Sequence, residues 1–277
     1  MRNSLSYILS IIILLTGCAR LPISQKKDII YDQNTKLGLS VYYPKKVEHP
    51  KDVFVFIHGG NWKNGDRFTY NFLGKGMARK GVVAVIIDYR LYPQTNYKGM
   101  AMDAVQSVKC VKENITGFGG DTNKIFVSGH SAGGHIAALI ATDNHYFDSL
   151  KIQNPLKGAI LIDPFGLDMN KYLHRNESYE REVYLSVFEK DSINWKNGSP
   201  TYHLHKGMPP FLMFVGGRTY PNIVNGSNDF MAALKPYQPD IFITKVPRKK
   251  HVGMIFSFAN PRKKAYRQII DFMDKTK

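Results

Sequence analysis

The sequence Gly-His-Ser-Ala-Gly at residues 129–133 lies between two segments of different character. Residues 124–128 (KIFVS) form a short β-branched and aromatic run typical of a buried strand, whereas small and apolar residues follow up to position 141. A strand that passes directly into a helix turns so sharply that small residues are needed on both sides, and the turn lifts the central hydroxyl above the sheet. The pattern therefore predicts that Ser131 is a nucleophile.

A second turn of the same kind lies upstream. Residues 53–57 (VFVFI) read as another buried strand, and His58, Gly59 and Gly60 follow it. Preorganised N–H donors contribute roughly 3 kcal/mol each when a carbonyl oxygen becomes negatively charged during acyl transfer. We expect the N–H groups of Gly59, Gly60 and Ala132 to form such an oxyanion hole. A tight turn between strand and helix is the alternative explanation for either motif taken alone.

The N-terminal segment is predicted to direct export. Arg2 precedes an apolar run at residues 5–15 that is too short to span a bilayer comfortably. Residues 15–18 (LTGC) resemble the lipobox of bacterial lipoproteins, which implies lipidation of Cys18. We expect a signal peptide at 1–17, a tether at 18–27 and an exported lipoprotein anchored to a membrane of a bacterial cell envelope. An uncleaved anchor or an ordinary signal peptide is the alternative.

Composition favours one large domain over residues 28–277, with 43% hydrophobic residues to bury both faces of a sheet. If Cys18 is lipidated, Cys110 has no partner for an intramolecular disulfide. The net charge of +16 favours contact with anionic lipid head groups or acidic polysaccharide. Nucleic acid is excluded as a partner because the basic residues are scattered, no binding motif is present and the chain is expected to be exported.

Apolar runs alternate with helical patterns along most of the chain. Strands are predicted at 37–43, 53–57, 82–87, 125–128, 159–162, 211–215 and 241–246, and helices at 72–80, 100–114, 132–141, 229–234 and 262–275. This order predicts an α/β fold with a mostly parallel sheet covered by helices on both faces. Residues 167–207 contain no clear strand pattern and are expected to form a helical cap.

Several side chains are expected to form the substrate pocket. Around the two turns these are His58, which would shape the oxyanion loop, together with Asn61, Trp62 and His130. Aromatic residues of the cap would form the wall of the pocket, although such residues suit a protein core equally well. These cap residues are Tyr172, Tyr179, Tyr184, Phe188 and Trp195.

From about residue 39 to the C-terminus the chain resembles the α/β-hydrolase family, in the branch of small esterases and acylaminoacyl-type hydrolases with H-G-G and G-x-S-A-G-G motifs. Residues 88–90 (DYR), Asp103 and residues 118–121 (FGGD) match further features of that branch. We interpret these acids and Arg90 as structural residues that hold loops under the site. The resemblance implies that no metal or organic cofactor is needed.

Ser131 needs a base that removes its proton as it attacks. The resemblance places this base at His251, which follows the last predicted strand and precedes the last predicted helix. Six other histidines are competitors for this role, and they are expected to flank the turns or lie in the cap. They are His58, His130, His135, His174, His203 and His205.

The third member of the triad departs from the family pattern. The family usually carries an acid shortly after the strand at 211–215, but residues 216–222 (GGRTYPN) contain no carboxylate. Asp163, directly after the strand at 159–162, resembles the acid of some lipases with this fold and would hold the imidazole in the required tautomer. The alternatives are Asp229, Asp168, a dyad without an acid, or a polar residue in place of the acid.

The leading functional prediction is a carboxylic-ester hydrolase that works through an acyl-enzyme. Its substrate is expected to be a small-molecule or glycan ester, with acetylated or feruloylated carbohydrate as the first class to test. An amidase or peptidase would use the same residues. A binding lipoprotein that has lost catalysis is the third hypothesis, and the missing acid after residue 215 is its best support.

Overall fold

One mixed sheet forms the centre of the protein. The computed structural model describes residues 21–175 and 179–276, and within them eight strands are ordered β1-β2-β4-β3-β5-β6-β7-β8. β2 runs antiparallel to β1 and β4, and the remaining neighbours are parallel. The strands are β1 (Ile23–Asp32), β2 (Leu37–Pro44), β3 (Lys51–Ile57), β4 (Val83–Ile87), β5 (Gly120–His130), β6 (Leu156–Ile162), β7 (Phe211–Gly216) and β8 (Ile243–Val246).

Helices cover both faces of this sheet. The helices are α1 (Asn71–Ala78), α2 (Tyr97–Asn114), α3 (Ala132–Thr142), α4 (His145–Ser149), α5 (Met169–Arg175), α6 (Tyr179–Phe188), α7 (Ser192–Asn197), α8 (Pro221–Leu234), α9 (His251–Phe256) and α10 (Lys264–Lys275). Apolar side chains of α2, α3 and α8 belong to the core on one face, and those of α1, α9 and α10 to the core on the other. The predicted α/β-hydrolase architecture with covered faces is confirmed.

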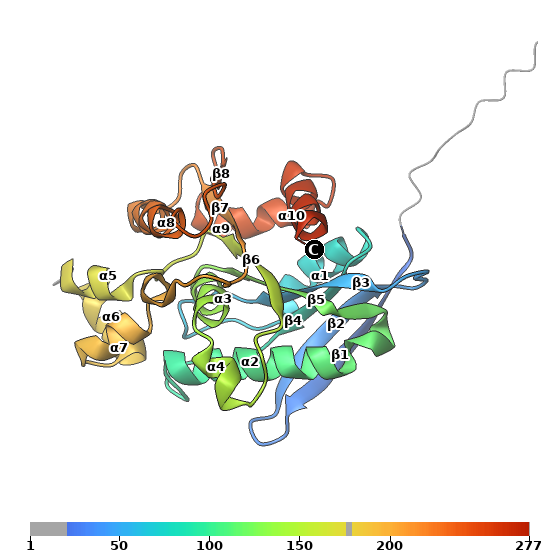
Figure 1. Ribbon diagram of the computed structural model, residues 1–277, viewed down its shortest axis with the longest axis horizontal. Helices are drawn as coiled ribbons and strands as arrows, with labels where there is room; N and C mark the ends of the chain where they lie inside the picture. Colours follow the sequence, from blue (N-terminus) through green and yellow to red (C-terminus); the bar gives the residue numbers. More distant parts are fainter. Residues whose placement is uncertain (1–20, 176–178, 277) are drawn as a thin grey trace, which may run out of the picture.

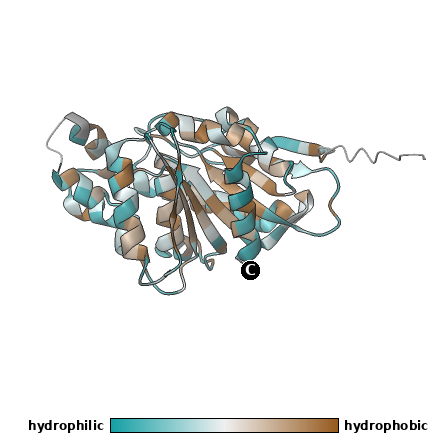
Figure 2. Ribbon diagram, turned by 90° about the horizontal axis from the view of Figure 1, so that it is seen from above, coloured by the Kyte–Doolittle hydropathy of each residue, from teal (hydrophilic) through white to brown (hydrophobic). Residues whose placement is uncertain are grey.

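The strand β3 shows why the sheet is buried on both sides. Val53, Val55 and Ile57 belong to one core, while Phe54 and Phe56 belong to the other. All five side chains are fully buried, so the strand reads as a continuous apolar run, as parallel strands covered on both faces do. Figure 2 shows the same feature, with hydrophobic colour concentrated in the central strands.

Parallel pairing brings the carboxyl ends of β3 to β8 to one edge of the sheet. Ile57 lies beside Gly129, and His130 lies beside Ile162. Residues that directly follow these strands therefore meet at this edge, which is where open α/β sheets bind their ligands. We call it the catalytic edge.

The prediction of a tether at residues 18–27 is wrong for its second half. Residues 23–27 belong to β1, which pairs with β2 from Ile23 beside Pro44 onward. β1 lies at the end of the sheet and alternates partly buried and exposed positions over much of its length, so its polar residues did not reveal a strand. The predicted signal peptide and Cys18 lie outside the described residues. Within the described part of the chain, none of the helices combines the length and the apolar character that crossing a membrane requires.

The segment predicted as a helical cap carries α5, α6 and α7. In Figure 1 these three helices lie together at one end of the molecule, away from β1 and β2. Ser199, which follows α7, accepts a hydrogen bond from the backbone N–H of Asn170 in α5 (3.1 Å). His135 of α3 contacts the carbonyl of Gly198 (2.6 Å), which fixes the cap to the body of the fold.

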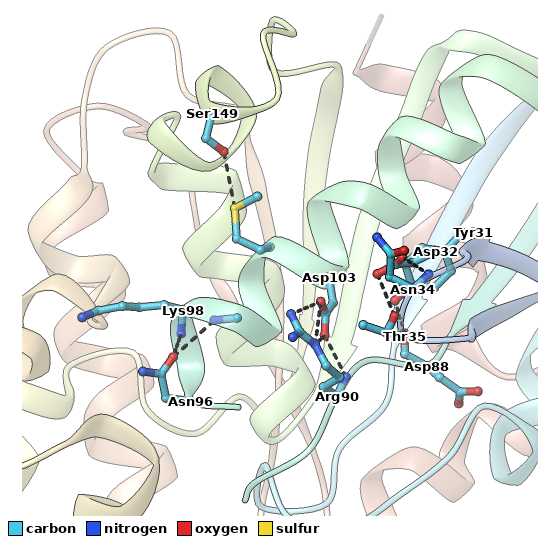
Figure 3. A network of polar contacts seen from close by, with 12 residues as sticks. Tyr31, Asp32, Asn34, Thr35, Asp88, Arg90, Asn96, Lys98, Asp103 and Ser149 are labelled. Atoms are coloured by element: carbon cyan, nitrogen blue, oxygen red, sulfur yellow. Dashed lines mark hydrogen bonds and ion pairs between the residues drawn. The ribbon is translucent and has the colours of Figure 1, made fainter. Parts of the chain in front are cut away.

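Asp88, Asp103 and Arg90, which we interpreted as structural, do hold loops. The guanidinium and backbone N–H of Arg90 donate to the fully buried carboxylate of Asp103, with the ion pair at 2.7 Å (Figure 3). Asp88 forms an ion pair with Arg67. Tyr89 lies between Asp88 and Arg90 in the chain, and its hydroxyl donates to the carbonyl of His58 (3.0 Å). The loop after β4 is thereby fixed beneath the turn that follows β3.

Candidate active site

Ser131 occupies a strained turn between β5 and α3. Its φ of 55° and ψ of −121° put it in a region that side-chain-bearing residues rarely adopt, at a cost of about 1–3 kcal/mol. The glycines on either side allow this turn to form. A Cβ on Gly129 would lie 2.1 Å from the carbonyl oxygen of Gly133, and one on Gly133 would lie 2.2 Å from that of Ile57. The sharp strand-to-helix turn predicted from the sequence is present.

Three side chains from separate elements meet at the catalytic edge. The Nε2 atom of His251 lies 2.8 Å from Oγ of Ser131, and its Nδ1 atom lies 2.7 Å from Oδ2 of Asp163. Nδ1–H donates to the carboxylate, which leaves Nε2 as the acceptor for the serine hydroxyl. His251 begins α9 and keeps 15% of its side chain exposed, whereas the side chain of Asp163 is fully buried. The structure brings the predicted nucleophile, base and acid together in hydrogen-bonding order.

Asp163 is held firmly in this position. Its Oδ1 atom accepts the backbone N–H of Gly216 (2.7 Å), and its Oδ2 atom accepts the hydroxyl of Thr219 in addition to His251. With a φ of 48° the residue is itself in a left-handed conformation directly after β6. Both carboxylate oxygens are used as acceptors, and the position of the side chain is fixed from three sides.

The alternative acids do not reach the imidazole. Asp229 forms an ion pair with Lys171 of the cap. Asp168 precedes α5, and its side chain accepts the backbone N–H of Lys171 (2.8 Å). Each of these carboxylates is therefore bonded to the cap rather than to His251.

Thr219 is a residue of the site that sequence reasoning missed. It lies in the 216–222 segment, where the resemblance implied an acid and this chain has none. Its hydroxyl donates to Asp163 instead. The sequence does show a polar side chain in that segment. Only the fold shows that the ends of β6 and β7 lie side by side, which brings Thr219 to Asp163.

The predicted oxyanion hole needs one correction. The N–H of Gly59 donates to the hydroxyl of Tyr70 (3.3 Å), so it is already used. Ala132 is the first residue of α3, and N–H groups in the first turn of a helix have no partner within the helix. Gly60 lines the serine pocket with a φ of +132°, and a Cβ there would lie 1.8 Å from the carbonyl oxygen of Asn64. Gly60 and Ala132 remain the candidate donors.

His130 contacts the base directly. Its ring stacks on that of His251, with 4.8 Å between the ring centroids, and its Nε2 atom lies 3.2 Å from the carbonyl oxygen of His251. Burial, followed by the charge of His251, lowers the pKa of His130 to about 4. It lines the pocket, as predicted.

Two residues expected in the pocket lie beneath it. His58 is buried behind the oxyanion turn, where its Nδ1 atom contacts the carbonyl of Gly59 (2.8 Å) and burial lowers its pKa. Trp62 is fully buried, and its indole N–H donates to Nδ1 of His135 (3.3 Å). Large aromatic rings close to an active-site motif are thus part of the core here. Asn61 does line the pocket.

The pocket around Ser131 has a volume of about 880 Å³. Tyr172 and Tyr184 of the cap line it, as predicted. Phe188 and Trp195 do not, because both are buried in the core, and the side chain of Tyr179 lies outside the described residues. Sequence reasoning missed further aromatic residues of the lining, which are Tyr70, Phe72, Phe165, Tyr220 and Phe256.

The geometry suits acyl transfer by a nucleophilic serine. An imidazole hydrogen-bonded to the hydroxyl and oriented by a buried carboxylate is the arrangement that activates serine. Among the described residues, no group of three or more His, Cys, Asp or Glu side chains is placed to hold a metal ion.

Fold and site together define an α/β hydrolase with a Ser-His-Asp triad. The chain belongs to the BD-FAE family, whose model matches residues 39–234.

Comparison with individual proteins agrees with this assignment. The chain is 29% identical to the isoprenylcysteine alpha-carbonyl methylesterase of Arabidopsis thaliana over 76% of this chain and 52% of the plant protein. It is 26% identical to the esterase LipC of Mycobacterium tuberculosis over 76% of this chain and 55% of that protein. The chain thus spans about half the length of the curated relatives it matches.

The fold is also similar to that of esterase B from Lactobacillus rhamnosis. The TM-score is 0.75 at 19% identity, and the superposition covers 92% of this chain and 86% of the other. The similarity shows that the two chains share a fold.

Proposed function

We propose that the protein is a carboxylic-ester hydrolase that works through an acyl-enzyme. Ser131 attacks the ester carbonyl while His251 takes its proton at Nε2, and Asp163 stabilises the imidazolium that forms. The N–H groups of Gly60 and Ala132 bind the developing oxyanion. The tetrahedral intermediate collapses as His251 protonates the leaving alcohol. Water, activated by the same imidazole, then releases the acid and restores the serine.

The observation that carries this proposal is the unbroken chain of hydrogen bonds from Asp163 through His251 to Ser131, with contacts of 2.7 Å and 2.8 Å. The alternative explanation of the motif, a tight turn between strand and helix, would require none of these contacts. The missing acid after β7, which favoured a binding protein without catalysis, is replaced by Asp163 from the neighbouring strand.

Covalent labelling and turnover test the proposal together. The full chain should react with a fluorophosphonate probe and hydrolyse 4-nitrophenyl acetate, and Ser131→Ala should abolish both. Ser107→Ala is a matched control, because Ser107 is a buried serine of α2 that bonds only to its own helix and should leave both readouts unchanged. An unlabelled wild-type chain would favour the binding protein. Faster cleavage of matched anilides than of esters would favour an amidase.

We further propose that the substrate is a small-molecule or glycan ester and that the protein is exported and lipid-anchored. Residues 15–18 support the anchor, because they place a cysteine where bacterial lipoproteins carry the lipid. Cys18→Ala should move the protein out of the membrane fraction and remove incorporation of labelled fatty acid. Unchanged fractionation and labelling of this variant would contradict lipidation.

A further inference from the structure

Positive charge is concentrated in two loops that adjoin His251. Residues 241–270 contain eight lysines and arginines and no aspartate or glutamate, and residues 216–228 contain Arg218 and no acid. The whole chain has 22 acidic residues, so their absence from these two segments is a local feature. The segments include the loop between β7 and α8 and the loop between β8 and α9. Both loops therefore carry positive charge that no acid of their own segment offsets.

The two loops contact each other directly. The backbone N–H of Arg218 donates to the carbonyl of Lys249 (2.9 Å), and the N–H of Gly217 donates to the carbonyl of Val246 (2.8 Å). This contact gathers four cationic residues at the catalytic edge, and we call them the cationic rim. They are Arg218, Arg248, Lys249 and Lys250.

No carboxylate neutralises the cationic rim within the part of the chain that the structure describes. Cations that hold the fold together are paired, as Arg90 is with Asp103. None of the four rim side chains forms an ion pair with a described residue, and all except Lys249 are exposed. Like charges on contacting loops repel one another, so the rim does not stabilise the fold. It leaves a positive potential at the surface that attracts anions.

The cationic rim adjoins the serine pocket. Lys250 is followed directly by His251 and Val252, and both of these residues line the pocket. Tyr220, two residues after Arg218, lines it as well, with its ring centroid 5.5 Å from that of His251. A substrate that extends out of the pocket on this side therefore passes over the rim.

The pocket and the rim differ in charge. Among the described residues that line the serine pocket, none is an aspartate, glutamate, lysine or arginine. The pocket thus suits a neutral ester group, whereas the rim attracts negative charge just outside it. A ligand that fits both regions is an ester whose neighbouring units are anionic.

The composition of the rim indicates the kind of anion. Arginine binds a carboxylate through two parallel hydrogen bonds, and the rim has two arginines and two lysines. Their distribution over two loops suits several carboxylates along a chain better than one small anion. An anionic bilayer usually binds through basic residues together with apolar side chains that insert into it. The exposed apolar side chains beside the rim, those of Tyr220 and Val252, line the serine pocket instead.

We propose that the cationic rim binds carboxylate groups of an acidic polysaccharide whose ester group is cleaved at Ser131. The proposal rests on the ester-hydrolase function proposed above and narrows its glycan esters to acidic ones. Sugar units next to the esterified one lie over the rim, and their carboxylates form ion pairs with it. Because the rim is exposed, salt screens this attraction.

The test compares two acetylated polymers with the same linkage between their sugar units. Polygalacturonate carries a carboxylate on each unit, and amylose carries none. Both are acetylated to the same degree, and acetate release by the full chain gives kcat/KM. The wild type should prefer the acidic polymer at about 20 mM salt and lose this preference at about 500 mM. Arg218→Gln/Arg248→Gln/Lys250→Gln should lower the ratio of the two kcat/KM values by about tenfold at low salt, as expected for three exposed ion pairs.

The matched control removes three exposed lysines at the other end of the sheet. It is Lys26→Gln/Lys45→Gln/Lys46→Gln, with the first residue in β1 and the other two directly after β2. This variant has the same net charge as the rim variant and should keep the wild-type ratio. An equal ratio in all three chains, or an equal loss in both variants, would overturn the proposal.

Two further outcomes separate the proposal from its alternatives. If the rim variant lost binding to phosphatidylglycerol vesicles but kept the wild-type ratio, the rim would bind a membrane and the proposal would be wrong. A wild-type chain that hydrolyses 4-nitrophenyl acetate without preferring the acidic polymer would also overturn it, while ester hydrolysis would stand. A wild-type chain that hydrolyses neither polymer nor 4-nitrophenyl acetate would overturn the proposed function, and the role of the rim with it.

Discussion

The imidazole of His130 stacks on that of His251 with an angle of 27° between the two rings, and its Nε2–H donates to the carbonyl oxygen of the same residue. Because the pKa of His130 is lowered to about 4, this ring is neutral near pH 7. A neutral aromatic ring therefore lies against the imidazole that becomes positively charged when it takes the proton of Ser131. Contacts of this kind favour the charged form and so act mainly in the transition state.

Removing this ring should lower kcat more than it raises KM. His130→Val removes both the ring and the donor, and we expect a loss of about tenfold in kcat, in line with cation–π contacts of about 0.5–2 kcal/mol. His130→Phe keeps a ring and should retain more of the rate. Steady-state kinetics with 4-nitrophenyl acetate measures both. Equal losses in the two variants would show that stacking contributes nothing.

The acid of the triad should be Asp163 and not Asp229. Asp163→Asn should lower kcat by about 10⁴-fold, because the amide no longer holds the imidazole in the required tautomer. Ser131→Ala should cost about a millionfold, as in other serine hydrolases. Asp229→Asn, in the residue that binds Lys171, should keep the rate for 4-nitrophenyl acetate within a few-fold. A large loss with Asp229→Asn and none with Asp163→Asn would reverse the assignment.

Thr219 should support catalysis through Asp163. Thr219→Val keeps the shape of the side chain but removes the hydroxyl that donates to the carboxylate. A hydrogen bond to a charged group is worth about 1.5–3 kcal/mol, so kcat should fall by about tenfold to a hundredfold. The pH dependence of kcat/KM should shift as well, because the partner of the base has changed. Thr219→Ser keeps the hydroxyl and should restore the rate, whereas an equally inactive serine variant would point to packing instead.

Three buried histidines should weaken the fold in acid. Burial lowers the pKa of His58, and it lowers those of His130 and His135 to about 4 from 6.5. The unfolded chain therefore binds more protons than the folded one between these values. The stabilisation by these neutral histidines is fully present above about pH 6.5. For His130 and His135 the free energy of unfolding falls as the pH drops toward 4, by about 1.4 kcal/mol per pH unit for each of the two, and His58 acts in the same direction.

Denaturant unfolding at several pH values measures this effect. His135→Gln should reduce the loss of stability between pH 6.5 and 4, because one titrating group is gone. His49→Gln, at an exposed histidine, is the control and should leave the slope unchanged. If the free energy of unfolding depended on pH equally in wild type and in His135→Gln, His135 would not be one of the titrating groups.

Local signals were enough to predict the nucleophile. The strand, the small residues and the helix around Ser131 lie within about twenty positions of one another, and each supports the others. His251 and Asp163 are harder to predict, because their contacts join distant parts of the chain. His251 is 120 residues from Ser131 and 88 residues from Asp163. Chain order and resemblance identified them, but only the pairing of β6 with β7 explains why an acid after β6 serves as well as one after β7.

Burial of individual side chains could not be predicted in the same way. Trp62 follows the H-G-G motif and Phe188 lies in the segment predicted as a cap, yet the two rings pack against each other in the core with 5.2 Å between their centroids. Likewise, nothing in the sequence shows that Tyr70 accepts the N–H of Gly59. These outcomes depend on which surfaces the cap and the oxyanion turn present to each other, and that is a property of the assembled fold.

The direction of β1 has a consequence for how the protein would be oriented. β1 starts with Ile23 beside Pro44 and ends with Asp32 beside Leu37, and Leu39 pairs with Ile87 near the catalytic edge. The chain therefore enters the sheet on the side away from Ser131, and the ten residues of β1 span about 33 Å. The six residues from Cys18 to Ile23 are joined by five Cα–Cα steps and reach at most about 18 Å. With the proposed lipid on Cys18, the bilayer would lie on the side of the sheet opposite the catalytic edge. The mouth of the pocket would then face away from the membrane, toward esters arriving from the surroundings.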